Sequence, residues 1–312
     1  MLIDMNPTVG NLVVEVASAE RQADALRLVF HHLGEADLAA VVGGLLVGAK
    51  CDPLPLSGLY VARRGETLVG AVWAQSQPGA TAVVWPPHLI AGEHDSTATV
   101  LLDAAMALMR QRRVSLAQSL LLSEFDPGVE RLKAVGFKYL AKLFYLASTH
   151  ANFPAAPLVS KLTFEPYREE NHVRLASTVV KTYEATRDCP ALDGARRIDD
   201  VLAGYRATGV FNPDSWLLVR YQNEDVGCLL LADHPGADQY ELVYMGLIPA
   251  ARGRCFGREV VKQAQWLTEL AGRPRLVLAV DADNRPALEM YRSCGFVMWN
   301  ERSVYIRSFD RG

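Results

Sequence analysis

Apolar and polar residues in the second half of the chain alternate with the periods of strands and helices. Aliphatic and aromatic runs bounded by turn residues predict strands. Apolar residues at helical spacing predict a helix over Arg258–Ala271, and Gly272 follows at the position of a C-terminal cap. The predicted order is strands at Trp216–Tyr221, Val226–Ala232 and Tyr240–Leu247, the helix, a buried strand at Leu276–Val280, a short helix from Pro286 to Gly295, and strands at Phe296–Asn300 and Ser303–Phe309.

The two halves of the chain repeat one pattern. A short strand with an acidic residue runs into an amphipathic helix from Leu12, and the same pattern recurs from Leu162 at an offset of 150 residues. Later, Gly136-Phe137 falls on Gly295-Phe296 at an offset of 159. A coincidental rhythm of strands and helices is the other interpretation. Because order and spacing recur over most of each half, the pattern favours duplication.

This repeat predicts two domains of mixed α/β class, at residues 1–150 and 151–312. At about 150 residues per domain, 312 residues suit two domains. Half of the residues are hydrophobic and 21% are charged, so each half can bury a core. Residues 148–160 are rich in Pro, Ala and small polar residues, which is typical of a linker.

Charge and hydropathy exclude two classes of partner. The net charge is −3 and the basic residues are scattered, whereas a protein that binds nucleic acid or an anionic membrane needs a clustered basic field. The most apolar run, Leu38–Ala49, is twelve residues long and too short to cross about 30 Å of hydrocarbon. Residues 67–92 carry no formal charge, but the turn at residues 75–79 predicts paired strands there instead of a membrane span.

The cysteines point to a reducing compartment. There are five of them, an odd number, widely spaced and without a Cys-x-x-Cys pair, so the sequence predicts neither a disulfide framework nor a zinc or other metal site. The first residues show no basic segment followed by an apolar one, so no signal peptide is predicted. We therefore expect a cytoplasmic protein. The sequence does not indicate its oligomeric state.

The segment IPAARGRCFGREVV, residues 248–261, joins a predicted strand to the long helix. Such a turn presents unpaired backbone N–H groups at a helix N-terminus, where the helix dipole favours an anion. Glycine lets the backbone approach phosphate oxygens closely, and Arg252, Arg254 and Arg258 add positive charge. A phosphate-binding loop is one interpretation. An ordinary turn on a solvated basic edge is the other.

A second motif makes the resemblance to a family specific. The loop is similar to the Arg/Gln-x-x-Gly-x-Gly/Ala motif of GNAT acyl-CoA N-acyltransferases, and DNRPALEMYRSCGF, residues 283–296, has the Asn-x-x-Ala-x-x-x-Tyr-x-x-x-Gly-Phe spacing of their second motif. The resemblance implies two tandem GNAT-like domains and acetyl-CoA as the acyl donor. The residues it assigns to coenzyme A are Gly246, Leu247, Ile248, Arg252, Gly253, Arg254, Cys255, Phe256, Gly257, Arg258, Asn284 and Ala287.

The resemblance also implies catalytic roles. An amine that attacks a thioester must lose a proton, and the leaving thiolate must gain one. Glu241 stands where many family members keep a general base, and Tyr291 stands where they keep the general acid. Backbone N–H groups of Gly246 and Leu247 would hold the carbonyl oxygen. The other interpretations are a surface carboxylate on an alternating strand for Glu241 and core packing for Tyr291.

One residue departs from the first motif. Cys255 stands where the family has the middle glycine. If this position needs a positive φ, the side chain costs on the order of 1 kcal/mol or more. Tolerance of a small side chain is the favoured interpretation. The alternative is a reactive thiol with a lowered pKa at a helix N-terminus.

The first half has lost these chemical groups. At the 159-residue offset the phosphate loop corresponds to Glu93–Ala98, which has no arginine and two carboxylates. Asn284 corresponds to Phe125 and Tyr291 to Leu132, and a leucine cannot donate a proton. We therefore expect a degenerate GNAT-like first domain and a catalytic second one. This layout is similar to that of mycothiol synthase in architecture alone, so no substrate is inferred from it.

Residues 181–210 occupy the segment that usually shapes the acceptor site in this family. Tyr183, Glu184, Asp188 and Asp193 are candidates for binding a cationic amine. A polar helix–loop surface is the other interpretation. The resemblance favours an N-acetyltransferase that transfers the acetyl group directly to a primary amine of a small molecule or a peptide. The alternative, suggested by Cys255 and the degenerate half, is a non-catalytic acyl-CoA-binding or regulatory protein.

Overall fold

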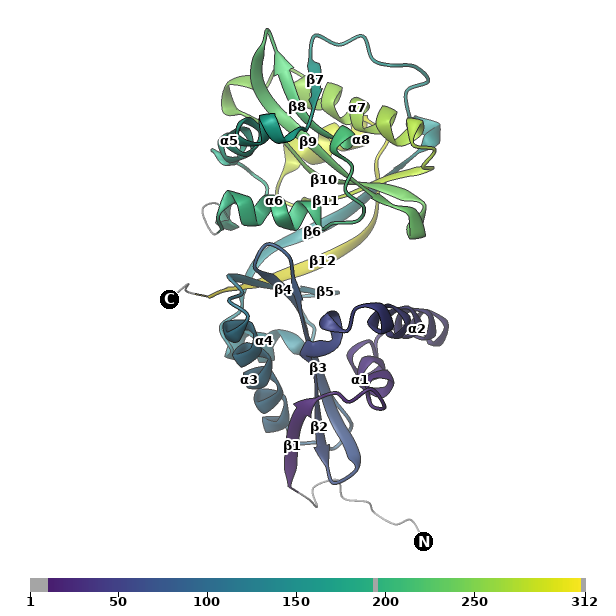
Figure 1. Ribbon diagram of the computed structural model, residues 1–312, viewed down its shortest axis with the longest axis vertical. Helices are drawn as coiled ribbons and strands as arrows, with labels where there is room; N and C mark the ends of the chain where they lie inside the picture. The colour runs from purple at the N-terminus through teal and green to yellow at the C-terminus, as the bar shows by residue number, and fades with distance from the viewer. Residues whose placement is uncertain (1–10, 193–195, 310–312) are drawn as a thin grey trace. The chain divides into compact units, whose positions relative to one another are not determined.

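The computed structural model describes residues 11–192 and 196–309 (Figure 1). These residues form two compact units. The first contains the chain up to Tyr139 together with the C-terminal residues from Val304, and the second contains Leu140–Ser303.

The first unit contains a sheet flanked by helices. Its strands follow the order β1-β2-β3-β4-β5, with β12 next to β5. Its core gathers buried residues of the strands and of α3, among them Leu101, Leu102 and Met106. The elements of this unit are β1 (Leu12–Val16), α1 (Gln22–Val29), α2 (Glu35–Cys51), η1 (Leu54–Gly58), β2 (Leu59–Arg64), β3 (Thr67–Gln77), β4 (Thr81–Leu89), α3 (Ser96–Gln111), β5 (Leu116–Leu121) and α4 (Gly128–Ala134).

The second unit repeats this order of elements. Its strands follow the order β12-β6-β11-β10-β9-β8-β7. Its elements are β6 (Lys138–Thr149), η2 (His150–Asn152), β7 (Thr163–Pro166), η3 (Glu169–Asn171), α5 (His172–Tyr183), η4 (Pro190–Leu192), α6 (Ile198–Arg206), η5 (Pro213–Ser215), β8 (Trp216–Tyr221), β9 (Glu224–His234), η6 (Pro235–Ala237), β10 (Gln239–Leu247), η7 (Pro249–Ala251), α7 (Phe256–Leu270), β11 (Arg275–Asp281), α8 (Arg285–Ser293) and β12 (Val297–Ser308).

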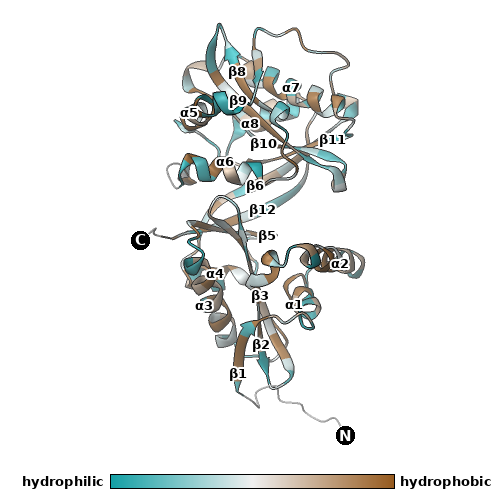
Figure 2. Ribbon diagram, in the orientation of Figure 1, coloured by the Kyte–Doolittle hydropathy of each residue, from teal (hydrophilic) through white to brown (hydrophobic). Residues whose placement is uncertain are grey.

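Helices cover both faces of the second sheet, as alternation along its strands requires. Inward-facing residues such as Leu229 and Leu278 form one core with Val260 of α7. Residues of the opposite face, including Trp216 and Leu230, form a second core together with residues of α5 and α6. Apolar and polar positions alternate along α7 (Figure 2), and the apolar residues that it buries include Val260, Val261 and Ala264.

Strands β10 and β11 separate after a short parallel pairing. Only two positions are in register, Tyr240 with Leu276 and Glu241 with Val277. The pairing of β10 with β9 continues to Leu247, with an irregularity between Leu242 and Tyr244. A bulge bends the strand that carries it. The two strands therefore diverge, and the gap between them is the place where the cavity described below opens.

Several predicted elements are confirmed. The strand at Trp216–Tyr221 has the predicted bounds, and the run at residues 67–92 folds as the paired strands β3 and β4. Gly272 has a φ of 67° after α7, as the C-terminal cap requires. The apolar run Leu38–Ala49 lies in α2. Among the helices of the two described ranges, none combines the length and apolar character that a membrane crossing requires.

One prediction is wrong at the C-terminus. The expected pair of strands at Phe296–Asn300 and Ser303–Phe309 is the single strand β12. The strand runs through the polar pair Glu301-Arg302, and Glu301 forms an ion pair with Lys142 of β6 at 3.4 Å. Strand β12 leaves the second unit, and its residues from Val304 belong to the first.

Candidate active site

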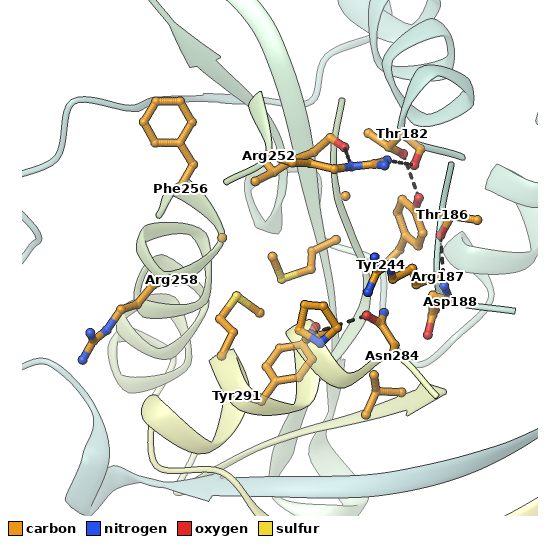
Figure 3. A pocket seen from close by; sticks show the side chains of 18 of the residues that line it. Thr182, Thr186, Arg187, Asp188, Tyr244, Arg252, Phe256, Arg258, Asn284 and Tyr291 are labelled. Carbon is orange, nitrogen blue, oxygen red and sulfur yellow. Dashed lines mark hydrogen bonds between the residues drawn. The ribbon is translucent and has the colours of Figure 1, made fainter. Parts of the chain in front are cut away.

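A cavity of about 630 Å³ opens where β10 leaves β11 (Figure 3). Its walls come from five segments that are distant in sequence. They are the C-terminal end of α5 with the following loop, strand β10, the loop before α7 with the first turn of that helix, strand β11, and helix α8.

The loop before α7 forms a cradle of free backbone amides. Gly253 and Cys255 have positive φ values of 73° and 63°, which turn successive N–H groups toward one side. Within the described part of the chain, no hydrogen bond uses the amides of residues 253–257 as donors. Helix α7 is fifteen residues long, so its dipole adds to this field. The cradle has the properties of an anion site. Cys255 does adopt the positive φ that the motif position was considered to need.

The three loop arginines have three different environments. Arg252 donates to the carbonyl oxygens of Leu247 at 3.0 Å, Ala185 at 3.0 Å and Thr182 at 2.9 Å. Its guanidinium therefore ties the loop to α5. Arg254 does not line the cavity, and its guanidinium lies 4.4 Å from the centroid of the Tyr221 ring.

Arg258 lines the cavity from the first turn of α7, and no hydrogen bond or ion pair within the described ranges engages its guanidinium (Figure 3). Of the three arginines it is the one whose guanidinium has no protein partner among the described residues, and its side chain leaves α7 on the side away from Tyr291 (Figure 3). Gly257, one residue earlier, has no room for a side chain, because an added Cβ would meet the Met290 sulfur at 2.7 Å.

Tyr291 stands at the other end of the cavity, on α8. Asn284 caps this helix by accepting a hydrogen bond from the Ala287 amide, and Pro286 occupies its first turn. The Tyr291 side chain is 6% exposed, and no hydroxyl partner occurs among the described residues. Burial raises its pKa well above the usual value. The hydroxyl therefore keeps its proton at all ordinary pH values and faces the cavity (Figure 3).

Glu241 is separated from this cavity wall. Its neighbours Tyr240 and Leu242 point into the core under α7, so its own side chain lies on the other face of the sheet. There it forms a hydrogen bond of 2.9 Å with Nε2 of His234. Glu241 does not line the cavity, although Leu242 and Val243 next to it do.

The wall contributed by α5 and its loop is aromatic and polar. The Thr182 and Tyr244 hydroxyls lie 2.7 Å apart, and the Tyr183 and Tyr205 hydroxyls lie 3.2 Å apart. The Tyr205 ring stacks on Tyr244 at a centroid distance of 5.3 Å. These contacts fix the side of the cavity on which Tyr183 and Tyr244 lie.

Asp188 adds a carboxylate to this wall. Its Oδ1 accepts a hydrogen bond of 3.0 Å from the Asp281 amide. In turn, Oδ2 of Asp281 accepts one of 3.1 Å from the Cys189 amide. Asp188 is exposed as a residue, but partial desolvation of its carboxylate by the cavity wall, with repulsion from Asp281, raises its pKa. The same burial and charges raise the pKa of the Cys189 thiol to about 12.

The structure brings most of the predicted site residues to one cavity. Ile248, Arg254, Glu184 and Glu241 do not line it, and Asp193 lies outside the described residues. The residues brought together are Tyr183, Asp188, Gly246, Leu247, Arg252, Gly253, Cys255, Phe256, Gly257, Arg258, Asn284, Ala287 and Tyr291.

The cavity is also lined by Thr182, Tyr244 and Met290, which no motif in the sequence indicates. Each belongs to an otherwise ordinary helix or strand pattern. The one local signal for Tyr244 is its position between Glu241, the predicted base, and the loop before α7. That signal does not reveal that the β10 irregularity brings the residue to this wall.

In the first unit, the loop before α3 corresponds to the loop before α7, and it contains a buried carboxylate. The Glu93 carboxylate is fully buried, pairs with Arg64 at 3.0 Å and accepts a hydrogen bond of 2.6 Å from the Thr97 hydroxyl at the start of α3. Leu132 is buried in the core, and Phe125 is 87% exposed. The positions that line the cavity in the second unit therefore correspond in the first unit to a loop with a buried ion pair and to a core leucine.

Residues 180–296 match the family model described as "Acetyltransferase (GNAT) family". A mycothiol acetyltransferase of Nocardioides sp. is 35% identical over 111 residues, which are 30% of this chain and 37% of that protein. One of Arthrobacter sp. is 28% identical over 168 residues, 51% of this chain and 50% of that protein. The chain thus spans half or less of the length of these two curated relatives.

Two solved structures show the fold. A GCN5-related N-acetyltransferase from Sphaerobacter thermophilus has a TM-score of 0.66 at 15% identity, covering 96% of each chain. A tandem GNAT protein from the clavulanic acid biosynthesis pathway has a TM-score of 0.53 at 13% identity, covering 97% of this chain and 99% of its own. The amide cradle, the diverging strands and the matched segment lie in one unit. The second unit therefore carries an acetyltransferase domain of the GNAT family, and the chain as a whole has the tandem GNAT architecture.

Proposed function

We propose that the second unit is an N-acetyltransferase that moves an acetyl group from acetyl-CoA directly to a primary amine of a small molecule or a peptide. One observation carries the proposal. A single cavity connects a cradle of free amides at the start of α7 to the buried hydroxyl of Tyr291. Curated relatives that are named acetyltransferases support the same reaction.

The residues present fit the acyl donor. The five free amides of residues 253–257 suit a pyrophosphate, because a helix N-terminus favours anions and Gly253 has no atom within 4 Å of an added Cβ. Arg258 would add a positive charge to this end. Asn284 and Ala287 would line the path of the pantetheine arm. Bound there, acetyl-CoA supplies the acetyl group as a thioester.

The residues of the chain handle the protons. As the new C–N bond forms and the C–S bond breaks, the sulfur needs a proton, and Tyr291 Oη would donate it. The backbone amides at Gly246 and Leu247 are our proposed donors to the carbonyl oxygen. Glu241 is our proposed base and would receive the amine proton through water, since its side chain does not line the cavity.

The first unit has a supporting role in this proposal. We propose a degenerate GNAT-like domain at residues 1–150 and a catalytic domain at 151–312. Because the Glu93 carboxylate fills the first unit's loop, a phosphate would meet a buried negative charge there. The five cysteines are all free, which supports a reducing cytoplasmic location.

The test measures coenzyme A binding by calorimetry and free thiol release from acetyl-CoA with a panel of primary amines. We expect coenzyme A to bind the wild-type chain and Tyr291→Phe alike. We expect thiol release by the variant to fall about 10²-fold or more, the usual contribution of a general acid. Tyr240→Phe is the matched control, because Tyr240 is equally buried but lies outside the cavity.

Other outcomes are equally informative. Coenzyme A binding without thiol release for any amine would support the alternative of a non-catalytic acyl-CoA-binding protein. No binding on folded protein would contradict the proposal. Unchanged turnover in Glu241→Gln would remove Glu241 from the mechanism and leave the reaction itself intact.

A further inference from the structure

The Glu241 carboxylate has one hydrogen-bond partner among the described residues, the imidazole of His234. The distance from Oε2 to Nε2 is 2.9 Å, and both side chains are half-buried. An ionised carboxylate only accepts hydrogen bonds, so Nε2 carries the proton and His234 is the donor. The other carboxylate oxygen, Oε1, accepts no hydrogen bond from the described residues.

The neighbouring carboxylate of Asp233 is held in a different way. Both of its oxygens accept hydrogen bonds from the Arg273 guanidinium, at 2.8 and 2.9 Å. An arginine always carries its charge, and a positive charge beside a carboxylate makes that carboxylate a poor acceptor of protons. A neutral histidine can donate a hydrogen bond without such a charge. The Glu241 carboxylate is therefore held in place and is still able to take up a proton.

The backbone fixes the His234 ring from two sides. Gly209 has a φ of +66°, and an added Cβ there would lie 2.9 Å from Cε1 and 3.0 Å from Nε2 of the ring. The ring therefore packs directly on the Gly209 backbone, a close approach that glycine permits. The Val210 amide donates to the Asp233 carbonyl oxygen at 2.7 Å, and the Asp233 amide donates to the Val210 carbonyl oxygen at 3.2 Å. These bonds join the segment after α6 to the end of β9.

Glu241 stands where β10 and β11 begin to separate. It is the last residue of β10 in register with β11, opposite Val277. The two residues that follow it, Leu242 and Val243, line the cavity. The carboxylate thus lies at the start of the opening between the strands, from where Oε1 can exchange protons with the cavity through water.

We infer that His234 is a positioning residue for Glu241, which holds one carboxylate oxygen so that the other receives the proton of the acceptor amine. The hydrogen bond from Nε2 fixes Oε2. As the new C–N bond forms, the amine proton passes through water to Oε1, which later releases it to solvent. His234 keeps its own proton throughout. This inference rests on the proposed function, because it concerns the base of that same reaction.

The kinetic test measures thiol release at saturating acetyl-CoA while the concentration of a reactive primary amine is varied. His234→Leu removes the donor and should lower kcat about tenfold or more, because a base that is free to rotate is often misplaced. The KM for the amine and the affinity for coenzyme A should change little, since His234 does not line the cavity. His234→Gln keeps an N–H donor and should recover most of the lost kcat.

Two further comparisons separate positioning from a structural role. In the Glu241→Gln background, His234→Leu should lower kcat no further, because both residues act through one carboxylate. Gly209→Ala should lower kcat as His234→Leu does, since its Cβ would displace the ring. Gly65→Ala is the matched control, because Gly65 also has a positive φ, 59°, but an added Cβ there meets no atom within 4 Å.

Long-range ¹H–¹⁵N NMR of the full chain gives a readout that does not depend on turnover. The signals of the His234 ring are identified by their absence in His234→Gln. At about pH 8, where an ordinary histidine is neutral, we expect the ring proton on Nε2. A proton on Nδ1 alone would overturn the inference, because Nε2 would then have none to donate to Glu241.

The outcomes distinguish this inference from the proposed function. An unchanged kcat in folded His234→Leu, an additional loss in the double variant, or no recovery in His234→Gln would overturn the inference alone. Unchanged turnover in Glu241→Gln would do the same. Absent coenzyme A binding, or absent thiol release by the wild-type chain, would overturn the proposed function and this inference with it.

Discussion

The Nε atom of Arg252 donates a hydrogen bond of 3.0 Å to the carbonyl oxygen of Leu247. The other guanidinium nitrogens reach the carbonyls of Thr182 and Ala185, about seventy residues earlier in the chain. The family resemblance assigns this arginine to coenzyme A. In the structure its side chain holds the loop, strand β10 and the end of α5 together.

Replacing Arg252 by lysine should therefore lower stability although the charge is kept. A lysine ammonium cannot reproduce the planar fork that serves three carbonyls, and each lost hydrogen bond is worth about 0.5–1.5 kcal/mol. We expect the free energy of unfolding in urea to fall by about 1–3 kcal/mol. Arg258→Lys, which breaks no hydrogen bond among the described residues, should stay within about 0.5 kcal/mol of wild type. Equal losses in both variants would contradict the role of Arg252.

Asp188→Asn should stabilise the chain at pH 7. Desolvation raises the pKa of Asp188 in the folded state. The contribution of such a carboxyl group to stability is fully present at a pH below its pKa in the unfolded chain, about 3.9. This contribution is lost as the pH rises through the higher pKa of the folded state. At pH 7 the ionised carboxylate therefore opposes folding, and asparagine cannot ionise. Urea unfolding at several pH values should show a gain that shrinks as the pH is lowered toward 4.

A loss of stability in Asp188→Asn at pH 7 would instead mean that its hydrogen bonds outweigh the cost of the charge. Glu184→Gln serves as the control. Its side chain is exposed, so stability should stay at the wild-type value across the same pH range.

Gly253 and Gly272 offer a matched pair for the amide cradle. Both have a positive φ, 73° and 67°, and an added Cβ at either would meet no atom within 4 Å. Alanine should cost each position about 1 kcal/mol of stability, because an L side chain disfavours this backbone conformation. Calorimetry should show weaker coenzyme A binding for Gly253→Ala alone, since Gly272 lies at the far end of α7. Equal coenzyme A affinities in the two variants would remove Gly253 from the cradle.

Acetyl-CoA should shield Cys255 from alkylation. Cys255 is exposed in the loop that would hold the pyrophosphate, and Cys51 is exposed at the end of α2. Labelling with iodoacetamide, followed by peptide mass spectrometry, should show slower modification of Cys255 when acetyl-CoA is present. Cys51 should react at the same rate in both samples. Equal rates at Cys255 with and without acetyl-CoA would place it outside the cofactor loop.

Local sequence patterns predicted most elements of the second unit. Strand Trp216–Tyr221 and the cap at Gly272 follow from apolar periodicity and from the conformational freedom of glycine. Strand β12 was predicted as two, because Glu301-Arg302 looks like a turn when only neighbours are considered. Glu301 pairs with Lys142, which lies 159 residues earlier in the chain, so a local pattern cannot indicate this contact.

Some features of the candidate site could also be predicted from local spacing, and others depend on the fold. The spacing of seven residues between Asn284 and Tyr291 was enough to place both on one side of α8. The partners of Arg252, the stacking of Arg254 on Tyr221 and the distance of Glu241 from the cavity could not be predicted. Each depends on where a long side chain finds its best acceptor or ring among segments that only the fold brings near.

The sequence by itself determined the order of strands and helices, the duplication and the two motifs, because these depend on residue type and on spacing within a few turns. Tertiary structure alone decided that β10 and β11 separate after Glu241 and that Asp188 reaches the opened cavity without a cation beside it. It also decided that the strand from Val304 completes the first unit. The reason is physical: strand divergence, burial and charge pairing are set by groups far apart in the chain, and their energies exist only once the chain has folded.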